Sequence, residues 1–307
     1  MVLGFLTACL PKVPLEEKAA WAAEKGFKAL EIAVWPRLND RDYASSDIDV
    51  AKLTQAEADK IRAMMDSLGL TISSLAYYDN NLDADPAKRA FVNNHTRQCI
   101  RAAKLLGVPA VGTFVGRNIT KTIADNFDEF ESVFGAIVRE AEEAGVQIII
   151  ENCPMESWQV PLQPGTISFS PELWQEMFRR VPNPNFGLNF DPSHLFYQLI
   201  DPLPLIGQFK DRILHVHAKD AELFPEKLAY YGIFNKLLPS SQDSGFWRFR
   251  MPGLGQVDLA GMVRELKKIG YTGVISIEHE DPLYEASEAK IYEGLELGLK
   301  HMTRLLA

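Results

Sequence analysis

Short apolar runs alternate with longer amphipathic segments along almost the whole chain. The runs are rich in Val, Ile, Leu and Phe, as buried strands are, and the longer segments have the 3.6-residue period of a helix. The predicted strands span residues 3–10, 29–34, 71–76, 110–115, 147–151, 186–191, 213–217 and 274–278. The predicted helices span 15–26, 55–68, 87–106, 127–144, 171–181, 259–269 and 287–306. This alternation predicts one domain, a (β/α)8 TIM barrel over residues 1–307.

Three junctions between a helix and the next strand share one pattern, a glycine followed by an apolar residue. They contain Gly26, Gly69 and Gly270. Glycine adopts the left-handed conformation that ends a helix, and the apolar residue then turns back towards the core. A doubly wound open sheet is the structural alternative. It is disfavoured because the first strand-to-helix turn has no glycine-rich phosphate loop.

Four of the apolar runs end in a carboxylate or an imidazole: Glu151, Asp191, His217 and Glu278. A single buried carboxylate is costly. In a barrel of parallel strands, however, the strand ends meet at one face. Two Glu, one Asp and one His that converge there would form a site for one divalent ion, Mn²⁺, Mg²⁺, Co²⁺ or Zn²⁺. The alternative is four unrelated loop residues.

At these positions the chain resembles the sugar phosphate isomerase/epimerase family, the xylose isomerase-like TIM barrels. The resemblance runs from end to end and rests on four motifs in order: Ile150-Glu151-Asn152, Asp191-Pro192-Ser193-His194, His217-Ala218-Lys219-Asp220 and Ile277-Glu278-His279-Glu280. It implies that the Glu, Asp, His and Glu at these motifs are the metal ligands. The family includes ketose epimerases, isomerases, inosose dehydratases and a DNA-repair nuclease branch.

The predicted chemistry is proton transfer beside the carbonyl of a keto-sugar or related polyol, through an enediolate. The metal would polarise the carbonyl, while Glu151 and Glu278 remove and return the proton. If the proton returns to the opposite face of the same carbon, the product is an epimer. If it returns to the neighbouring carbon, the product is an aldose–ketose isomer. The alternative is a lyase or dehydratase, in which a β-hydroxyl leaves. The sequence does not distinguish epimerisation, isomerisation and dehydration.

Further residues are predicted to bind the substrate. The resemblance implies that His194 contacts it near the reacting carbonyl, unless this histidine is structural. Lys219 could reach the substrate or form a structural pair with Asp220. We expect Trp247 and Arg250 to contact it from a long loop after the seventh strand.

That loop is predicted to span about 218–257 and to close the site. The alternatives are that its arginines form salt bridges, or that the loop packs against a neighbouring subunit.

Other aromatic and histidine residues have weaker signals. Aromatic side chains at strand ends could form a carbohydrate floor or simply pack in the core; they are Trp35, Tyr77, Phe114, Trp158 and Trp247. His215 shares a strand face with His217, so it could support the metal ligand or line the barrel. His279 has the opposite parity from Glu278 and is expected outside the site. His95 is expected on a helix surface.

The composition of the chain argues against nucleic acid or a membrane as a partner. The chain has 307 residues, 47% of them hydrophobic, and a net charge of −9, and it has no basic cluster for nucleic acid. Its three cysteines include no Cys-x-x-Cys pair. No apolar run approaches a membrane span, so we expect a cytoplasmic protein without a membrane partner. A signal segment at residues 1–11 is the alternative. The expected partner is a small carbohydrate, without phosphate because no glycine-rich cradle exists; a homo-oligomer is left open.

Two other functional classes are disfavoured. The nuclease branch of the family uses three zinc ions, with added histidines on the third and fourth strands and an Asp-x-His motif. At the strand ends this chain has Tyr77 and Thr113-Phe114, and Trp247 and Phe249 occupy the Asp-x-His positions. A sugar-binding protein without catalysis would not need the complete ligand set.

Overall fold

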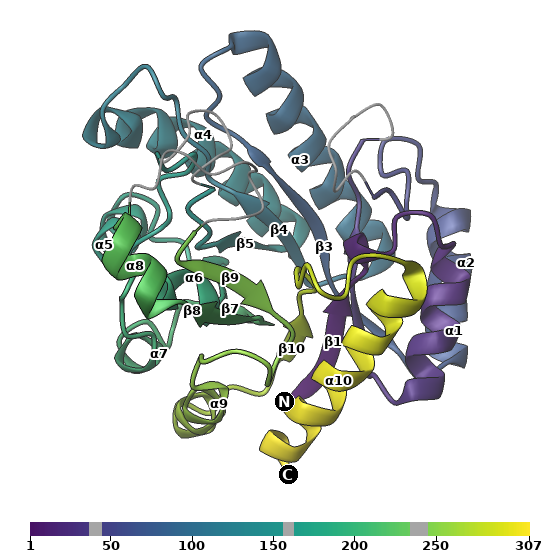
Figure 1. The fold of residues 1–307 in the computed structure, drawn as a ribbon. Coiled ribbons are helices and arrows are strands. Elements are labelled where there is room, and N and C mark those ends of the chain that lie inside the picture. Colours follow the sequence, from purple (N-terminus) through teal and green to yellow (C-terminus); the bar gives the residue numbers. More distant parts are fainter. Residues whose placement is uncertain (37–44, 156–162, 234–244) are drawn as a thin grey trace.

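The computed structural model describes residues 1–36, 45–155, 163–233 and 245–307. Within these ranges eight parallel strands close into a barrel, in the order β1, β10, β7, β6, β5, β4, β3, β2 (Figure 1). The barrel strands are β1 (Val2–Leu6), β2 (Ala29–Ala33), β3 (Thr71–Asn80), β4 (Ala110–Phe114), β5 (Gln147–Glu151), β6 (Phe186–Phe190), β7 (Ile213–Ala218) and β10 (Val274–Ile277). The predicted single-domain (β/α)8 barrel is confirmed.

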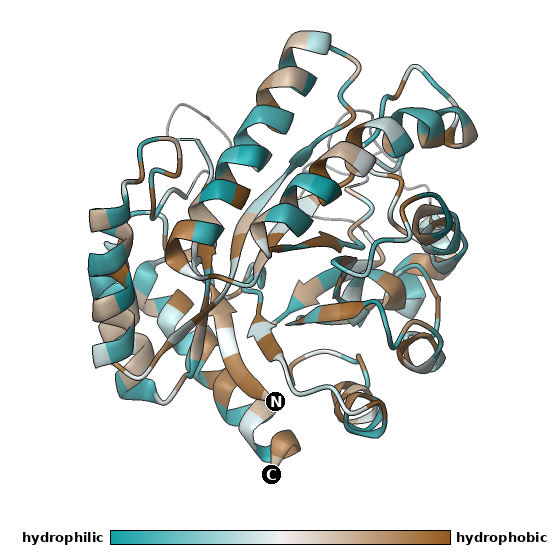
Figure 2. Cartoon of the chain, turned by 180° about the vertical axis from the view of Figure 1, so that it is seen from behind, coloured by the Kyte–Doolittle hydropathy of each residue, from teal (hydrophilic) through white to brown (hydrophobic). Residues whose placement is uncertain are grey.

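Seven long helices correspond to the predicted ones. They are α1 (Leu15–Lys25), α2 (Gln55–Ser67), α3 (Pro86–Leu106), α4 (Ile123–Ala144), α5 (Pro171–Arg180), α9 (Leu259–Lys268) and α10 (Glu288–Leu306). Figure 2 shows that their outer faces are mostly hydrophilic, whereas the barrel strands are mostly hydrophobic. Within the described ranges, none of the helices combines the length and the apolar composition that a membrane span requires.

Four short helices were not predicted from the sequence: the 3-10 helix η1 (Thr7–Cys9), α6 (Pro192–Phe196), α7 (Leu203–Gln208) and α8 (Pro225–Tyr231). They are too short for a 3.6-residue period to be recognised.

The predicted glycine junctions are confirmed. Gly26, Gly69 and Gly270 have φ angles of +100°, +65° and +73°. After Gly26, the backbone N–H of Phe27 donates back to the carbonyl of Ala22 at 3.0 Å, which ends α1 and starts the turn into β2.

The first strand is shorter than predicted, since β1 ends at Leu6 and the chain continues as η1. Thr7 forms hydrogen bonds that do not belong to the backbone ladder of the barrel. Its carbonyl accepts a hydrogen bond from the buried Lys18 ammonium at 3.1 Å, and its hydroxyl donates to Asp47 at 2.5 Å. The same hydroxyl accepts from the N–H of Ala33 in β2 at 2.9 Å, so Thr7 contacts the neighbouring strand through its side chain where the backbone ladder of β1 ends.

Residues 218–257, predicted as a long loop, contain regular structure. The antiparallel strands β8 (Asp220–Leu223) and β9 (Trp247–Arg250) form a hairpin beside the barrel mouth. Asp220 anchors the chain after this hairpin, because its carboxylate accepts four backbone N–H groups. The donors are Ala221, Gly253, Gly255 and Val257, at 2.8–3.0 Å.

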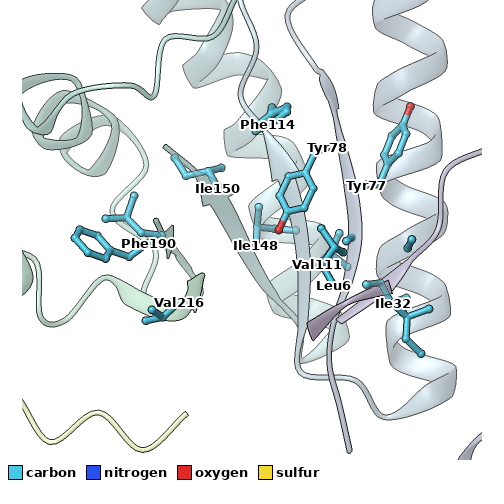
Figure 3. Packing of buried hydrophobic residues seen from close by; sticks show 14 of the residues in the cluster. Leu6, Ile32, Tyr77, Tyr78, Val111, Phe114, Ile148, Ile150, Phe190 and Val216 are labelled. Atoms are coloured by element: carbon cyan, nitrogen blue, oxygen red, sulfur yellow. The ribbon is translucent and has the colours of Figure 1, made fainter. Parts of the chain in front are cut away.

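Consecutive residues of β3 face opposite sides of the barrel wall. Figure 3 shows Tyr78 pointing into the barrel and Tyr77 pointing away from it. The Tyr77 ring contacts the His95 imidazole of α3, with 4.4 Å between the ring centroids. His95 is 6% exposed, so the prediction that it lies on the surface is wrong. The barrel interior is therefore reached by Tyr78, which the sequence analysis did not select.

Candidate metal centre

The four residues expected to converge are brought together at the carboxyl ends of the strands. Glu151 ends β5, Asp191 follows β6, His217 lies in β7 and Glu278 follows β10. One ligand atom from each lies within 4.8 Å of the other three, and all four residues are buried. Their role as metal ligands stays a prediction.

Asn152 fixes the backbone positions of two of these residues. Its side-chain nitrogen donates to the Asp191 carbonyl, and its side-chain oxygen accepts from the Asp191 N–H, both at 2.8 Å. Asp191 also caps α6, because its Oδ1 accepts from the N–H of Ser193 at 2.7 Å. These bonds leave Asp191 Oδ2 as the oxygen that points into the site. Two adjacent strand ends are therefore held in register by one side chain.

His217 divides its two ring nitrogens between two groups of carboxylates. Nδ1 lies 3.1 Å from Glu278 Oε2 and 3.3 Å from Glu151 Oε1. Nε2 lies 2.9 Å from Glu31 Oε2, on the opposite edge of the ring. The nitrogen that faces the candidate metal ligands is therefore Nδ1.

Glu31 was missed in the sequence. It lies inside the apolar run 29–34 on β2 and is fully buried. The same signal that selected the four strand-end residues, a carboxylate in an apolar run, was present here. Burial raises the pKa of Glu31, but the charge and hydrogen bond of His217, with further help from His215 and Tyr78, outweigh it and lower the pKa to about 2.

Lys219 extends into the same cluster. Its ammonium donates to Glu278 Oε2 at 2.6 Å and to Glu280 Oε2 at 2.8 Å, and it lies 3.3 Å from Asp191 Oδ2 and 3.0 Å from His194 Nε2. Lys219 is 1% exposed. It does not pair with Asp220, which anchors the hairpin, so the two neighbours have separate functions.

The ionisation of the glutamates follows from these contacts. Burial raises the pKa of Glu151, but hydrogen bonds from His194 and His217 and the charge of Lys219 hold it well below its usual value. Burial also raises the pKa of Glu280, and Lys219 only partly offsets this, so that pKa rises to about 7. Carboxylates in different protonation states therefore lie within one site, as acid–base catalysis requires.

The β8–β9 hairpin reaches the site with Phe249. The Phe249 ring lies 4.3 Å from the Lys219 ammonium and 5.3 Å from the His194 ring, measured to ring centroids. Trp247, on the same face of β9, stacks on Tyr197 with the ring planes 2° apart. Trp247 was predicted from the sequence and Phe249 was not, because the residues alone do not tell which side chains of β9 face the site.

Arg250 has the opposite parity on β9 from Phe249. Its guanidinium bonds to Asp281 Oδ2 at 3.0 Å and to Glu222 Oε2 at 2.8 Å. These contacts are the loop salt bridges considered as the alternative. Contact of Arg250 or Trp247 with substrate stays a prediction.

A pocket opens above the cluster. Its described lining consists of Leu6, Ala8, Cys9, Trp35, Tyr78, Phe114, Glu151, Met155, Glu278, His279 and Glu280. Of the aromatic residues for which a carbohydrate floor or core packing was left open, Trp35 and Phe114 line the pocket, Tyr77 faces away and Trp158 lies outside the described residues. His279, which was expected outside the site, is among the lining residues, while its ring packs against Gly294 of α10. In the described ranges, no lysine or arginine lines this pocket.

Comparison with known proteins agrees with the barrel fold described above. The family model described as "Xylose isomerase-like TIM barrel" matches residues 19–301. The chain belongs to this family. Among curated relatives, the uncharacterized protein YfiH of Bacillus subtilis (strain 168) is 27% identical, over 96% of this chain and 97% of its own. An inosose dehydratase of Lacticaseibacillus casei is 25% identical, over 76% of this chain and 78% of its own.

Solved structures share the barrel. The crystal structure of the IOLI protein with a bound zinc atom has a TM-score of 0.74 and 20% identity, and covers 100% of this chain and 98% of its own. This likeness shows that the two proteins share the barrel fold.

The cluster suits a divalent cation in this xylose isomerase-like barrel. Asp191 Oδ2 is buried and accepts no hydrogen bond from any residue that the structure describes. Four carboxylates face the Lys219 ammonium, those of Glu151, Asp191, Glu278 and Glu280, and a fifth, Glu31, faces His217. This gathering of oxygen and imidazole donors matches the preferences of Mn²⁺, Mg²⁺, Co²⁺ and Zn²⁺.

Proposed function

We propose that this protein is a divalent-metal-dependent enzyme that removes the proton beside the carbonyl of an uncharged keto-sugar or keto-polyol. The observation that carries the proposal is the convergence of Glu151, Asp191, His217 and Glu278 on one buried point. These four side chains would hold the ion. When bound, the ion would polarise the substrate carbonyl and offset the negative charge that develops on it.

The protein's own groups would handle the proton. Glu151 is ionised and buried, so it can accept a proton from a carbon acid without competition from bulk water. Glu278, like Glu151, lies beside His217 Nδ1 and accepts from the Lys219 ammonium at 2.6 Å, so a proton passed from Lys219 to Glu278 could be returned to the carbon from another direction. With two such carboxylates the result is isomerisation or epimerisation, which is the activity that the sequence predicted.

Dehydration is the second candidate, and Lys219 favours it. Loss of a β-hydroxyl needs a group that protonates the leaving oxygen. Lys219 carries a proton within the cluster, because Glu278, Glu280 and Asp191 outweigh the effect of burial and raise the pKa of its ammonium. The relative of Lacticaseibacillus casei that is named inosose dehydratase supports the same outcome.

The pocket supports an uncharged substrate. Its described lining combines apolar and aromatic side chains with three carboxylates and His279. A phosphate or carboxylate on the substrate would face Glu151, Glu278 and Glu280 without a basic side chain in the described lining to neutralise it. Aromatic rings such as Trp35 and Phe114 can instead pack against the C–H faces of a sugar or cyclitol.

The test is proton exchange in D₂O. Protein loaded with Mn²⁺ would be incubated with a panel of keto-sugars and inososes, and the products followed by mass spectrometry, and by NMR after removal of the ion. We expect deuterium at the carbon beside the carbonyl, and no incorporation after chelation. Deuterated isomers or epimers would indicate the first candidate. A product lighter by one water would indicate dehydration. Metal-loaded protein that exchanges no proton in any substrate of the panel would contradict the proposal.

A further inference from the structure

Glu31 lies below the candidate ligands, within the barrel, and its two oxygens have different partners. Oε2 accepts from His217 Nε2 at 2.9 Å. Oε1 accepts from the Tyr78 hydroxyl at 2.7 Å. Glu31 and His217 have no exposed surface, and Tyr78 is 4% exposed. Since Glu31 does not border the pocket in the described lining, it reaches the site through the side chains bonded to it, His217 and Tyr78.

The orientation of the His217 proton decides whether this residue can bind an ion. A neutral imidazole carries one N–H, and the other nitrogen offers a lone pair. Nδ1 faces the carboxylates of Glu151 and Glu278, so binding to an ion between them needs the lone pair on Nδ1. The proton must then lie on Nε2, and it needs an acceptor there.

Asn189 favours the opposite arrangement. Its Nδ2 lies 2.8 Å from His217 Nε2 and 2.7 Å from the Tyr78 hydroxyl, while its Oδ1 lies 2.9 Å from His215 Nδ1. An amide nitrogen only donates, so Asn189 by itself would select His217 with an acceptor at Nε2 and a proton at Nδ1. An ionised carboxylate only accepts, so Glu31 selects the proton at Nε2. The tautomer of His217 thus depends on Glu31.

We propose that Glu31 is the positioning residue that holds His217 with its Nδ1 lone pair directed at the metal, and thereby sets the metal affinity. This role rests on the metal site of the proposed function. Carboxylates that accept from a metal-bound histidine typically contribute a factor of about 10–100 in metal affinity. The Oε2 atom of Glu31 lies 2.9 Å from His217 Nε2, the nitrogen that must keep its proton, so we expect an effect in that range.

The experiment is a Co²⁺ titration of the full chain, followed by calorimetry and proton NMR. The N–H of a histidine bound to paramagnetic Co²⁺ gives a strongly shifted signal that disappears in D₂O. We expect one such signal from Nε2–H of His217 in the wild type. Glu31→Leu, which removes the acceptor, should raise the Kd for Co²⁺ about 10–100-fold and should abolish the signal or make it exchange rapidly.

Two further variants make the result specific. Glu176→Gln removes a carboxylate from α5, where it pairs with Arg179 and Arg180, and leaves Glu31 and His217 untouched, so its Co²⁺ affinity and N–H signal should stay close to those of the wild type. If Glu31→Leu does not fold, Glu31→Gln replaces it; this variant keeps the shape, removes the charge, and should still weaken binding and shift the signal.

The outcomes separate this inference from the proposed function. Co²⁺ binding by the wild type with an unchanged Kd and an unchanged N–H signal in the Glu31 variant would overturn the role of Glu31 alone. A wild type that binds no Co²⁺ would overturn the metal site and, with it, this role. Weaker binding together with a lost signal would support both.

Discussion

Replacement of either Glu151 or Glu278 by glutamine is expected to abolish measurable turnover while the barrel stays folded. Each carboxylate is proposed both to hold the ion and to move the proton. Loss of a positioned base typically lowers the rate by a factor of about 10²–10⁴, and weaker metal binding would add to this. Glutamine has nearly the same shape, so the packing around His217 should change little. Steady-state kinetics with the substrate found by deuterium exchange would measure the loss.

A matched control is available on the surface. Glu176 on α5 forms ion pairs with Arg179 and Arg180, far in the fold from the strand ends. Glu176→Gln should keep normal turnover. Near-normal rates in Glu151→Gln or Glu278→Gln would remove that glutamate from the chemistry, provided that circular dichroism shows each variant folded.

Lys219→Met is expected to lower turnover by about 10²–10⁴, the usual contribution of a positioned acid. The methionine keeps most of the aliphatic volume beneath Phe249, and only the charged end is lost. The ammonium lies 2.6–3.9 Å from three of the proposed ligand carboxylates. Removal of this neighbouring positive charge should therefore preserve or tighten metal binding, in contrast to the glutamate variants.

The same variant has a stability consequence that checks the interpretation. Without an ion, Glu278 and Glu280 would lose their buried cation, and breaking such a pair costs about 3–5 kcal/mol. Thermal unfolding should therefore show a lower Tm for metal-free Lys219→Met, partly restored by Mn²⁺. Full turnover in this variant would exclude Lys219 as an acid or substrate ligand. Reduced turnover with unchanged metal binding would support that role.

The sequence was sufficient for the barrel because its signals are local and repeated. Apolar runs, amphipathic helices and glycine stops each depend on a few neighbouring residues. The strand ends of a barrel necessarily share one face, so Glu151, Asp191, His217 and Glu278 could be grouped without coordinates. Local signals failed where tertiary contacts decide the outcome, as at Thr7, which bonds to Lys18 and Asp47 where β1 ends early.

The remainder of the site depended on directions that the sequence does not encode. Phe249 and Arg250 are neighbours, and only the hairpin geometry tells which of them faces Lys219. Glu31 had the same signal as the strand-end residues, a carboxylate in an apolar run, but its contact with His217 across the barrel could not be inferred from the sequence. Residues that act through another side chain leave no periodic pattern, because their partners are distant in the chain.

The central claim, that four strand-end residues bind one catalytic divalent ion, is tested most directly by a crystal structure of the protein soaked in Mn²⁺, with anomalous diffraction to locate the ion. We predict one strong anomalous peak at roughly 2.0–2.6 Å from carboxylate oxygens of Glu151, Asp191 and Glu278 and from Nδ1 of His217. A map with no peak among these side chains, at an Mn²⁺ concentration that supports any activity found, would contradict the account.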